Sequence, residues 1–149
     1  MVVSTKRLKP LIAAAAIAAS ATPGVAKDCY APDALAQQRA FSRAVTTEGG
    51  KTIWLGGQTG SPEKNFDGQV REIFAELDKT IKAAGGGGLT DMVTMTVFIT
   101  DVRNGDRLTE IRKEIFKNCF PASALISVTG LARPGLLLEI QGMAVVGAK

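Results

Sequence analysis

The side chain best suited to chemistry in this 149-residue chain is the carboxylate of Glu139, which stands inside an apolar run near the C-terminus. Alternate side chains of a strand point to opposite faces. Leu138 and Ile140 therefore share one face, while Glu139 shares the other with Gln141 and Met143. A glutamate in a partly dry cleft can exchange protons with a bound ligand, whereas one on a wet strand face mainly discourages aggregation. The pattern alone leaves both interpretations open.

The chain contains no histidine. This excludes serine and cysteine nucleophiles that depend on an imidazole base, and it excludes zinc held by histidine. We expect neither a metal ion nor an organic cofactor.

Cys29 and Cys119 are the two cysteines of the chain. In an oxidising compartment they could form a disulfide that closes a long loop, worth at most about 4.7 kcal/mol by the chain-entropy argument. Two unpaired thiols are the alternative, because the sequence does not place the two α-carbons.

Short motifs stand in a fixed order along the chain: Phe41-Ser42-Arg43-Ala44-Val45, Leu55-Gly56-Gly57-Gln58, Thr96-Val97-Phe98-Ile99-Thr100-Asp101, Pro121-Ala122-Ser123, Leu131-Ala132-Arg133-Pro134 and Glu139-Ile140-Gln141. Their order and spacing resemble the YjgF/RidA family of reactive-intermediate deaminases, over a span from about Phe41 to Val146. The resemblance implies a chorismate-mutase-like fold, a homotrimer, and ligand clefts where neighbouring subunits meet.

The resemblance also implies roles for individual residues. In family members that hydrolyse imines or enamines, the arginine of a P-A-R motif binds the substrate carboxylate, and the first glutamate of E-I-E positions the attacking water. Glu139 matches that glutamate and is the candidate catalytic residue. The implied ligand-binding positions are Phe41, Gly57, Ser123 and Leu125.

This chain departs from the family pattern at the arginine, which is replaced by Ser123. A hydrogen bond to a charged group contributes about 1.5–3 kcal/mol, so losing a bidentate anchor should weaken binding of a 2-imino acid at least tenfold. Phe41, Gly56 and Leu125 also replace polar residues of the family. We expect an apolar cleft in which Glu139 is the only charge.

Arg43, in an expected strand, and Arg133, in an expected turn, are poor substitutes for the missing guanidinium. Two functions follow. The first is a binding module whose clefts hold a small, mostly apolar or cationic ligand. The second is a deaminase-like hydrolase of the 2-iminobutanoate/2-iminopropanoate type, in which Glu139 activates water on a neutral imine and ammonia is released. The ribonuclease activity sometimes attached to the family name is a further alternative.

Residues 1–26 have the layout of a signal peptide. The basic start consists of Lys6, Arg7 and Lys9, and the apolar run extends from Leu11 to Ala19. Small residues precede two possible cleavage points, after Ala21 and after Ala26. The apolar run is too short for a permanent membrane-spanning helix. We therefore expect an exported protein, periplasmic or secreted, without stable membrane insertion once the leader is removed. Residues 27–40 would form an N-terminal arm and residues 41–149 a single RidA-like domain.

The net charge of +4 belongs mostly to the leader, because residues 1–26 hold three basic side chains and no acidic one. Removing them leaves a charge of +1. With one Trp and one Tyr, the chain also offers few surfaces on which bases could stack. We expect a small-molecule ligand and no nucleic-acid partner.

Hydrophobic periodicity predicts the order β-β-α-β-α-β-β. The expected strands are 41–45 and 52–55, paired as a hairpin, then 92–100 and two final strands between 120 and 146 that are joined by a Pro-Gly turn. Residues 56–60 are expected to be a loop. The expected helices are 67–84, ended by a glycine run, and about 106–118. This order favours an α+β domain with helices on one face of a mixed sheet.

Overall fold

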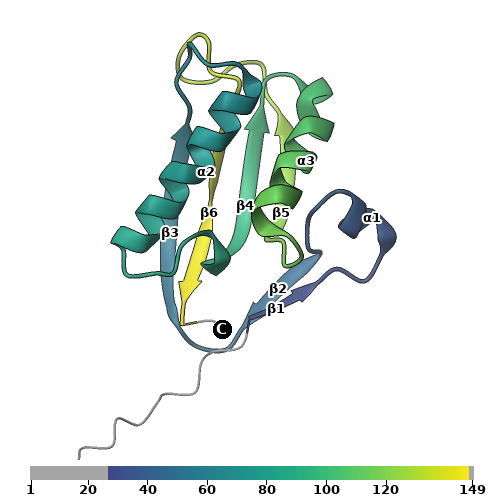
Figure 1. Cartoon of the computed structure of the whole chain (residues 1–149), viewed down its shortest axis with the longest axis vertical. Coiled ribbons are helices and arrows are strands. Elements are labelled where there is room, and N and C mark those ends of the chain that lie inside the picture. Colours follow the sequence, from purple (N-terminus) through teal and green to yellow (C-terminus); the bar gives the residue numbers. More distant parts are fainter. Residues whose placement is uncertain (1–26, 148–149) are drawn as a thin grey trace, which may run out of the picture.

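The computed structural model describes residues 27–147, and a four-stranded mixed sheet forms its centre (Figure 1). The strands are β3 (Lys51–Thr59), β4 (Met92–Ile99), β5 (Ala122–Ser127) and β6 (Leu138–Val146), in the spatial order β3-β6-β4-β5. β4 and β5 run parallel, and the other neighbouring strands are antiparallel. The signal peptide expected over residues 1–26 lies outside the described residues.

Two helices, α2 (Phe66–Ala83) and α3 (Gly105–Phe116), lie side by side on one face of this sheet (Figure 1). Short 3-10 helices, η1 (Leu89–Asp91) and η2 (Val102–Asn104), precede β4 and α3. The predicted α+β class, the order of the elements from residue 41 onward, and the placement of the helices on one face are confirmed.

α2 follows the predicted apolar spacing closely. The side chains that recur every three or four residues are all buried: Phe66, Val70, Ile73, Phe74, Leu77 and Ile81. Asn65 caps the first turn by accepting a hydrogen bond from Gly68 N at 2.9 Å. Gly85, at φ 94°, follows the last turn, in the left-handed conformation that glycine adopts without strain.

The core lies between these two helices and the sheet. The sheet contributes Ile53, Leu55, Met92, Met95, Val97, Ile99, Leu138, Ile140 and Ala144. From α3, Leu108 and Ile111 are buried, and Ile115 and Phe116 pack at the margin. No helix among residues 27–147 has the length and apolar character needed to cross a membrane.

The N-terminal segment contains secondary structure that the sequence pattern did not predict. It forms β1 (Lys27–Tyr30) and α1 (Ala34–Gln38), and β1 pairs with β2 (Ala44–Thr47) in a separate two-stranded sheet. The predicted hairpin between 41–45 and 52–55 is therefore wrong, since β3 pairs with β6. The chain does turn at Gly49 and Gly50, both at positive φ, but this turn leads from one sheet into the other.

Two further expectations about strands are wrong. Residues 56–59 continue β3 and do not form a loop, because a register shift between Leu55 and Gln58 absorbs the extra residue as a β-bulge. β5 and β6 do not form a hairpin, because β4 lies between them. The crossover through α3 places β5 parallel to β4, and residues 128–137 then carry the chain over β4 to β6.

The face of the sheet opposite α2 and α3 is largely uncovered. At one end Val45 of β2 packs on Val93 and Val145. A register shift between Met92 and Thr94 turns Val93 to this face, away from the main core. Farther along the same face, Trp54 is 78% exposed and Ile126 is 43% exposed.

Candidate functional site

Glu139 points to the uncovered face of the sheet. It is paired with Phe98 of β4 and Thr59 of β3, whereas its neighbours Leu138 and Ile140 are fully buried on the helix side. The half-buried Glu139 lines an open pocket of about 400 Å³, together with Phe98, Val128, Gly130, Leu131, Ala132 and Gln141. Within residues 27–147 no cation pairs with the Glu139 carboxylate, which leaves this group available to a ligand.

Gly57 makes room for that carboxylate. A Cβ built on Gly57 would overlap Glu139 Oε1 and would lie 2.8 Å from Glu139 Cδ. Gly57 lies in the β3 bulge, and bulges commonly redirect the local backbone. One predicted ligand-binding position, Gly57, therefore lies directly against the predicted catalytic one.

The other three predicted ligand-binding residues, Phe41, Ser123 and Leu125, meet in a different pocket of about 210 Å³. Its remaining wall consists of Arg39, Gly105, Leu108, Thr109 and Arg112. Ser123 pairs with Met95 and Leu125 with Val97, whose side chains belong to the helix-side core. This pocket therefore lies on the helix side, between α3 and the edge strand β5.

Arg112 is the residue of this pocket that the sequence reasoning missed. Its side chain is only 6% exposed. Nη1 donates a hydrogen bond to Ser123 Oγ at 3.1 Å, and Nη2 donates one to the carbonyl oxygen of Arg39. Nε is buried without a partner among the described residues. α3 therefore places a guanidinium beside Ser123, where the sequence led us to expect none.

The Arg112 guanidinium has no carboxylate partner within residues 27–147. Burial, with a smaller contribution from the nearby charge of Arg39, lowers the pKa of Arg112 to about 10. It is therefore still charged at neutral pH. Arg39, which also lines this pocket, pairs with the exposed Asp106.

A signal in the sequence could have revealed Arg112. Gly105, Leu108, Thr109 and Arg112 follow helical spacing, so the arginine lies on the pocket side of α3, beside its apolar stripe. A charge there is either buried or in contact with a ligand. The two arginines that were weighed as substitutes line neither pocket: Arg43 pairs with Asp33 at 2.9 Å, and Arg133 lies in the 128–137 connection.

The predicted site is thus divided into two halves. Ser123 and Leu125 lie on the helix face at the sheet edge, while Gly57 and Glu139 lie on the open face. β4 separates the strands that carry Ser123 and Glu139. One chain alone does not bring these two groups to the same ligand.

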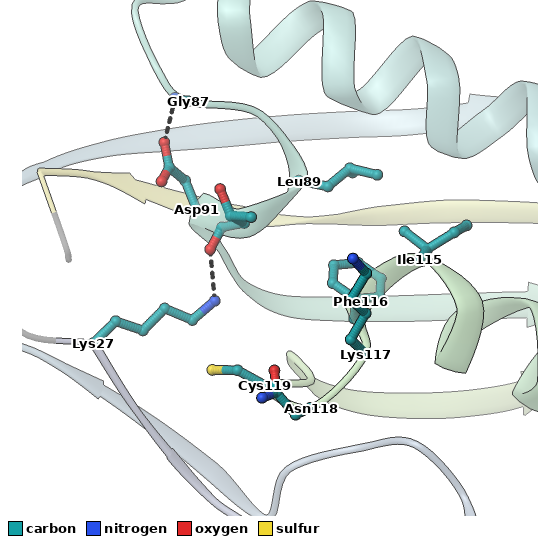
Figure 2. A pocket seen from close by; sticks show the side chains of 10 residues that line it. Lys27, Gly87, Leu89, Asp91, Ile115, Phe116, Lys117, Asn118 and Cys119 are labelled. Atoms are coloured by element: carbon teal, nitrogen blue, oxygen red, sulfur yellow. Dashed lines mark hydrogen bonds between the residues drawn. The ribbon is translucent and has the colours of Figure 1, made fainter.

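A larger cavity, about 690 Å³, lies at another end of the fold, beside β1 and the end of α3 (Figure 2). Lys27 Nζ donates hydrogen bonds to the carbonyl oxygens of Thr90 and Met92 at 2.8 and 2.7 Å, and burial lowers the pKa of Lys27. Asp91 accepts a hydrogen bond from Gly87 N at 2.6 Å. These charged groups are occupied by the backbone, so the cavity offers less chemistry than the two smaller pockets.

Cys119 lines this cavity and is joined to Cys29 by a disulfide, with the α-carbons 5.6 Å apart. The bond ties β1 to the segment that precedes β5. Among residues 27–147 no group of three or more acidic or cysteine side chains is arranged to hold a metal ion.

Known proteins resemble this chain over most of its length. A family described as Endoribonuclease L-PSP matches residues 31–146. The human 2-iminobutanoate/2-iminopropanoate deaminase is 32% identical over 114 residues, covering 72% of this chain and 80% of that protein. A Rid-family protein of unknown function from Yersinia pestis has a TM-score of 0.71 at 22% identity and covers 80% of this chain and 98% of its own. A YjgF-family protein from Mycobacterium tuberculosis has a TM-score of 0.61 at 26% identity, with coverage of 81% and 100%.

Proposed function

The chain belongs to the YjgF/RidA family, and we propose that it is a homotrimeric small-molecule-binding protein whose ligand clefts lie between subunits. The observation that carries this proposal is the separation of Ser123 and Glu139 on opposite faces of one sheet. A second copy can complete the site by presenting its Glu139 face to the Ser123 pocket of its neighbour.

The geometry of such a contact favours a ring. The surface that carries Glu139 and the edge that carries Ser123 are different surfaces, so their contact is heterologous. Heterologous contacts close into a ring when the rotation between copies permits it, and the family resemblance implies a ring of three.

The uncovered sheet face supports the same proposal. Trp54 and Ile126 are large apolar side chains that remain exposed there. Aromatic residues are enriched at protein interfaces, so the exposed Trp54 in particular suits a contact with another subunit. A neighbouring subunit would remove this surface from water.

The oligomeric state tests the proposal. For the protein purified after expression of the full chain, sedimentation equilibrium should give three times the mass of one chain. Trp54→Asp should lower that mass, because it puts a charge into the interface. Lys79→Asp, on the exposed side of α2, should leave it unchanged. A monomeric or dimeric mass for the unmodified protein would refute the proposed trimer.

Hydrolysis of an imine is the second candidate function, favoured by the unpaired Glu139 carboxylate next to Gly57. In this reaction water adds to the imine carbon, the C–N bond breaks, and the carbon becomes a carbonyl as ammonia leaves. Glu139 would take a proton from the water and return it to the departing nitrogen. The relatives named 2-iminobutanoate/2-iminopropanoate deaminase supply the substrate class to test.

An assay can separate the two functions. A serine dehydratase generates 2-aminoacrylate, and ammonia release is followed with and without the protein. Acceleration that is lost in Glu139→Gln but kept in Glu76→Gln, an exposed acid on α2, would establish the hydrolase. If ammonia is released only at the spontaneous rate, the hydrolase is refuted and the binding function remains.

We place the mature protein outside the cytoplasm, in the periplasm or the surrounding medium. The signal-like leader and the disulfide between Cys29 and Cys119 both support this location, since disulfides persist in oxidising compartments. Fractionation of cells that express the full chain, with N-terminal sequencing of the product, tests it. The intact N-terminus in the cytoplasmic fraction would contradict export.

A further inference from the structure

The guanidinium of Arg112 has more hydrogen-bonding capacity than the fold uses. An arginine carries five N–H donors. Ser123 and the carbonyl oxygen of Arg39 each accept from one of them, and the buried Nε has no partner among the described residues. Three of the five donors therefore have no partner among the described residues, and two of these three belong to the terminal Nη atoms.

We propose that Arg112 is the anion-binding residue of the cleft and that the pocket beside Ser123 receives the carboxylate of a small organic acid. This inference rests on the proposed small-molecule-binding function and names its ligand class. It reverses the expectation, based on Ser123 alone, that carboxylate ligands are disfavoured.

The geometry of the pocket matches a carboxylate. A planar guanidinium can donate two parallel hydrogen bonds to the two oxygens of that group. Because the Ser123 hydroxyl oxygen accepts from Arg112, its own hydrogen is free to donate to the same ligand. The small serine side chain also leaves open the space that a longer side chain on β5 would fill.

The rest of the wall suits the body of a small organic acid. Phe41, Leu108 and Leu125 supply apolar surface, and the volume of about 210 Å³ limits the ligand to a few heavy atoms beyond the carboxylate. Arg39 adds positive charge at the rim, with Asp106 as its partner.

The strongest reason to expect an anionic ligand in this pocket is electrostatic. A buried charge without a counter-ion is costly, and such charges are normally paired in folded proteins. Arg112 is 6% exposed and lacks an acidic partner in the described part of the chain. A bound carboxylate would supply that partner.

Calorimetric titration of the purified protein tests the ligand class without any variant. The probe is 2-oxobutanoate, the oxo acid that corresponds to the imino acid in the names of the relatives. Its uncharged analogue, butan-2-one, should bind at least tenfold more weakly because it lacks the carboxylate. Inorganic phosphate should bind more weakly than 2-oxobutanoate. Equal or tighter binding of either competitor, or no binding of 2-oxobutanoate, overturns the proposal.

Variants then test the residue. Arg112→Met should weaken 2-oxobutanoate binding at least tenfold, and Arg112→Lys should weaken it less. Arg103→Met removes an exposed arginine that pairs with Asp101 and should have no effect. Adding Ser123→Arg to Arg112→Met should restore much of the affinity, a rescue that a purely structural role for Arg112 would not produce. Unchanged binding in Arg112→Met and Arg112→Lys overturns the assignment.

The outcomes for the trimer and for Arg112 are distinguishable. A trimer that does not bind 2-oxobutanoate would refute the role of Arg112 and leave the assembly in place. A monomer that binds it through Arg112 would refute the assembly and leave the anion site in place.

Discussion

Arg112 Nη1 lies 3.1 Å from Ser123 Oγ and donates a hydrogen bond to it. The pair links α3 to β5 and puts a buried guanidinium beside the strand position where the family motif has its arginine. The two residues are 11 positions apart and meet because α3 folds back onto the sheet. The positive charge of this pocket therefore could not be predicted from the motif on β5, because Arg112 lies on α3.

Gly57→Ala should destabilise the protein and displace Glu139. The added Cβ would overlap the Glu139 carboxylate, and overpacking of this kind costs about 1–3 kcal/mol. Gly56→Ala is the matched control, because a Cβ there meets no atom within 4 Å. Chemical denaturation should show a larger loss of unfolding free energy for Gly57→Ala. Equal losses for the two variants would mean that Gly57 does not make room for Glu139.

The disulfide between Cys29 and Cys119 should stabilise the fold. It spans 90 positions and anchors β1, so its removal should lower the unfolding free energy by about 2–5 kcal/mol. The double variant Cys29→Ser/Cys119→Ser measures this loss against the oxidised protein. Thiol titration of the denatured protein should find no free thiol before reduction and two after it. Two free thiols before reduction would show that the bond does not form.

Gln69 should be the main anchor of the 128–137 connection, which supplies one wall of the Glu139 pocket. The fully buried side chain donates to the carbonyl oxygens of Lys64 and Gly135 and accepts from Leu137 N, at 2.9–3.0 Å. Gln69→Leu leaves these groups unpaired and should cost about 2–4 kcal/mol.

Gln37→Leu is the control for this change, since Gln37 makes one exposed hydrogen bond, to Ala31 O. It should change the unfolding free energy by less than about 1 kcal/mol. Faster amide hydrogen exchange across residues 128–137 in Gln69→Leu would confirm the anchoring role. Exchange at the unmodified rate would contradict it.

Stability should fall in acid, in part because of Glu72. Hydrogen bonds from the Ser61 backbone N and hydroxyl group, at 2.7 and 2.9 Å, lower the pKa of Glu72 below its usual 4.5. Between the folded and the unfolded pKa of Glu72, the unfolded chain therefore binds more protons than the folded chain. The contribution of Glu72 is present above its unfolded pKa and is lost as the pH falls through the folded pKa.

Glu72→Gln should therefore reduce the acid sensitivity of the protein. The loss of unfolding free energy between about pH 5 and about pH 3 should be smaller than in the unmodified protein. Denaturation at a series of pH values measures it. An unchanged dependence on pH would show that these hydrogen bonds do not favour the ionised form.

Local patterns in the sequence predicted the elements well. The apolar stripe from Phe66 to Ile81 was sufficient to predict α2, and the alternation of side chains was sufficient to predict β6. Helix and strand periods are set by the backbone itself, so they can be recognised in a short stretch of sequence. Strand partners were predicted poorly. The pairing of β3 with β6, and the position of β4 between β5 and β6, depend on contacts between distant segments.

The residues of the candidate site were likewise predicted better than their arrangement in space. The motifs indicated Glu139, Gly57, Ser123 and Leu125, and the structure brings them together in two pairs, not in one group. The sequence did not reveal that the pairs lie on opposite faces, since this requires the register of β5 and β6 against β4.

Chemical cross-linking between Leu125 and Glu139 is the most direct test of a cleft shared by two subunits. In Leu125→Cys/Glu139→Cys a short bis-maleimide should join neighbouring chains and give dimers and trimers on a denaturing gel, because the two positions lie on opposite faces within one chain. Lys79→Cys/Glu139→Cys should remain monomeric on the gel. Only monomers from the Leu125→Cys/Glu139→Cys protein would contradict a site completed by a second copy.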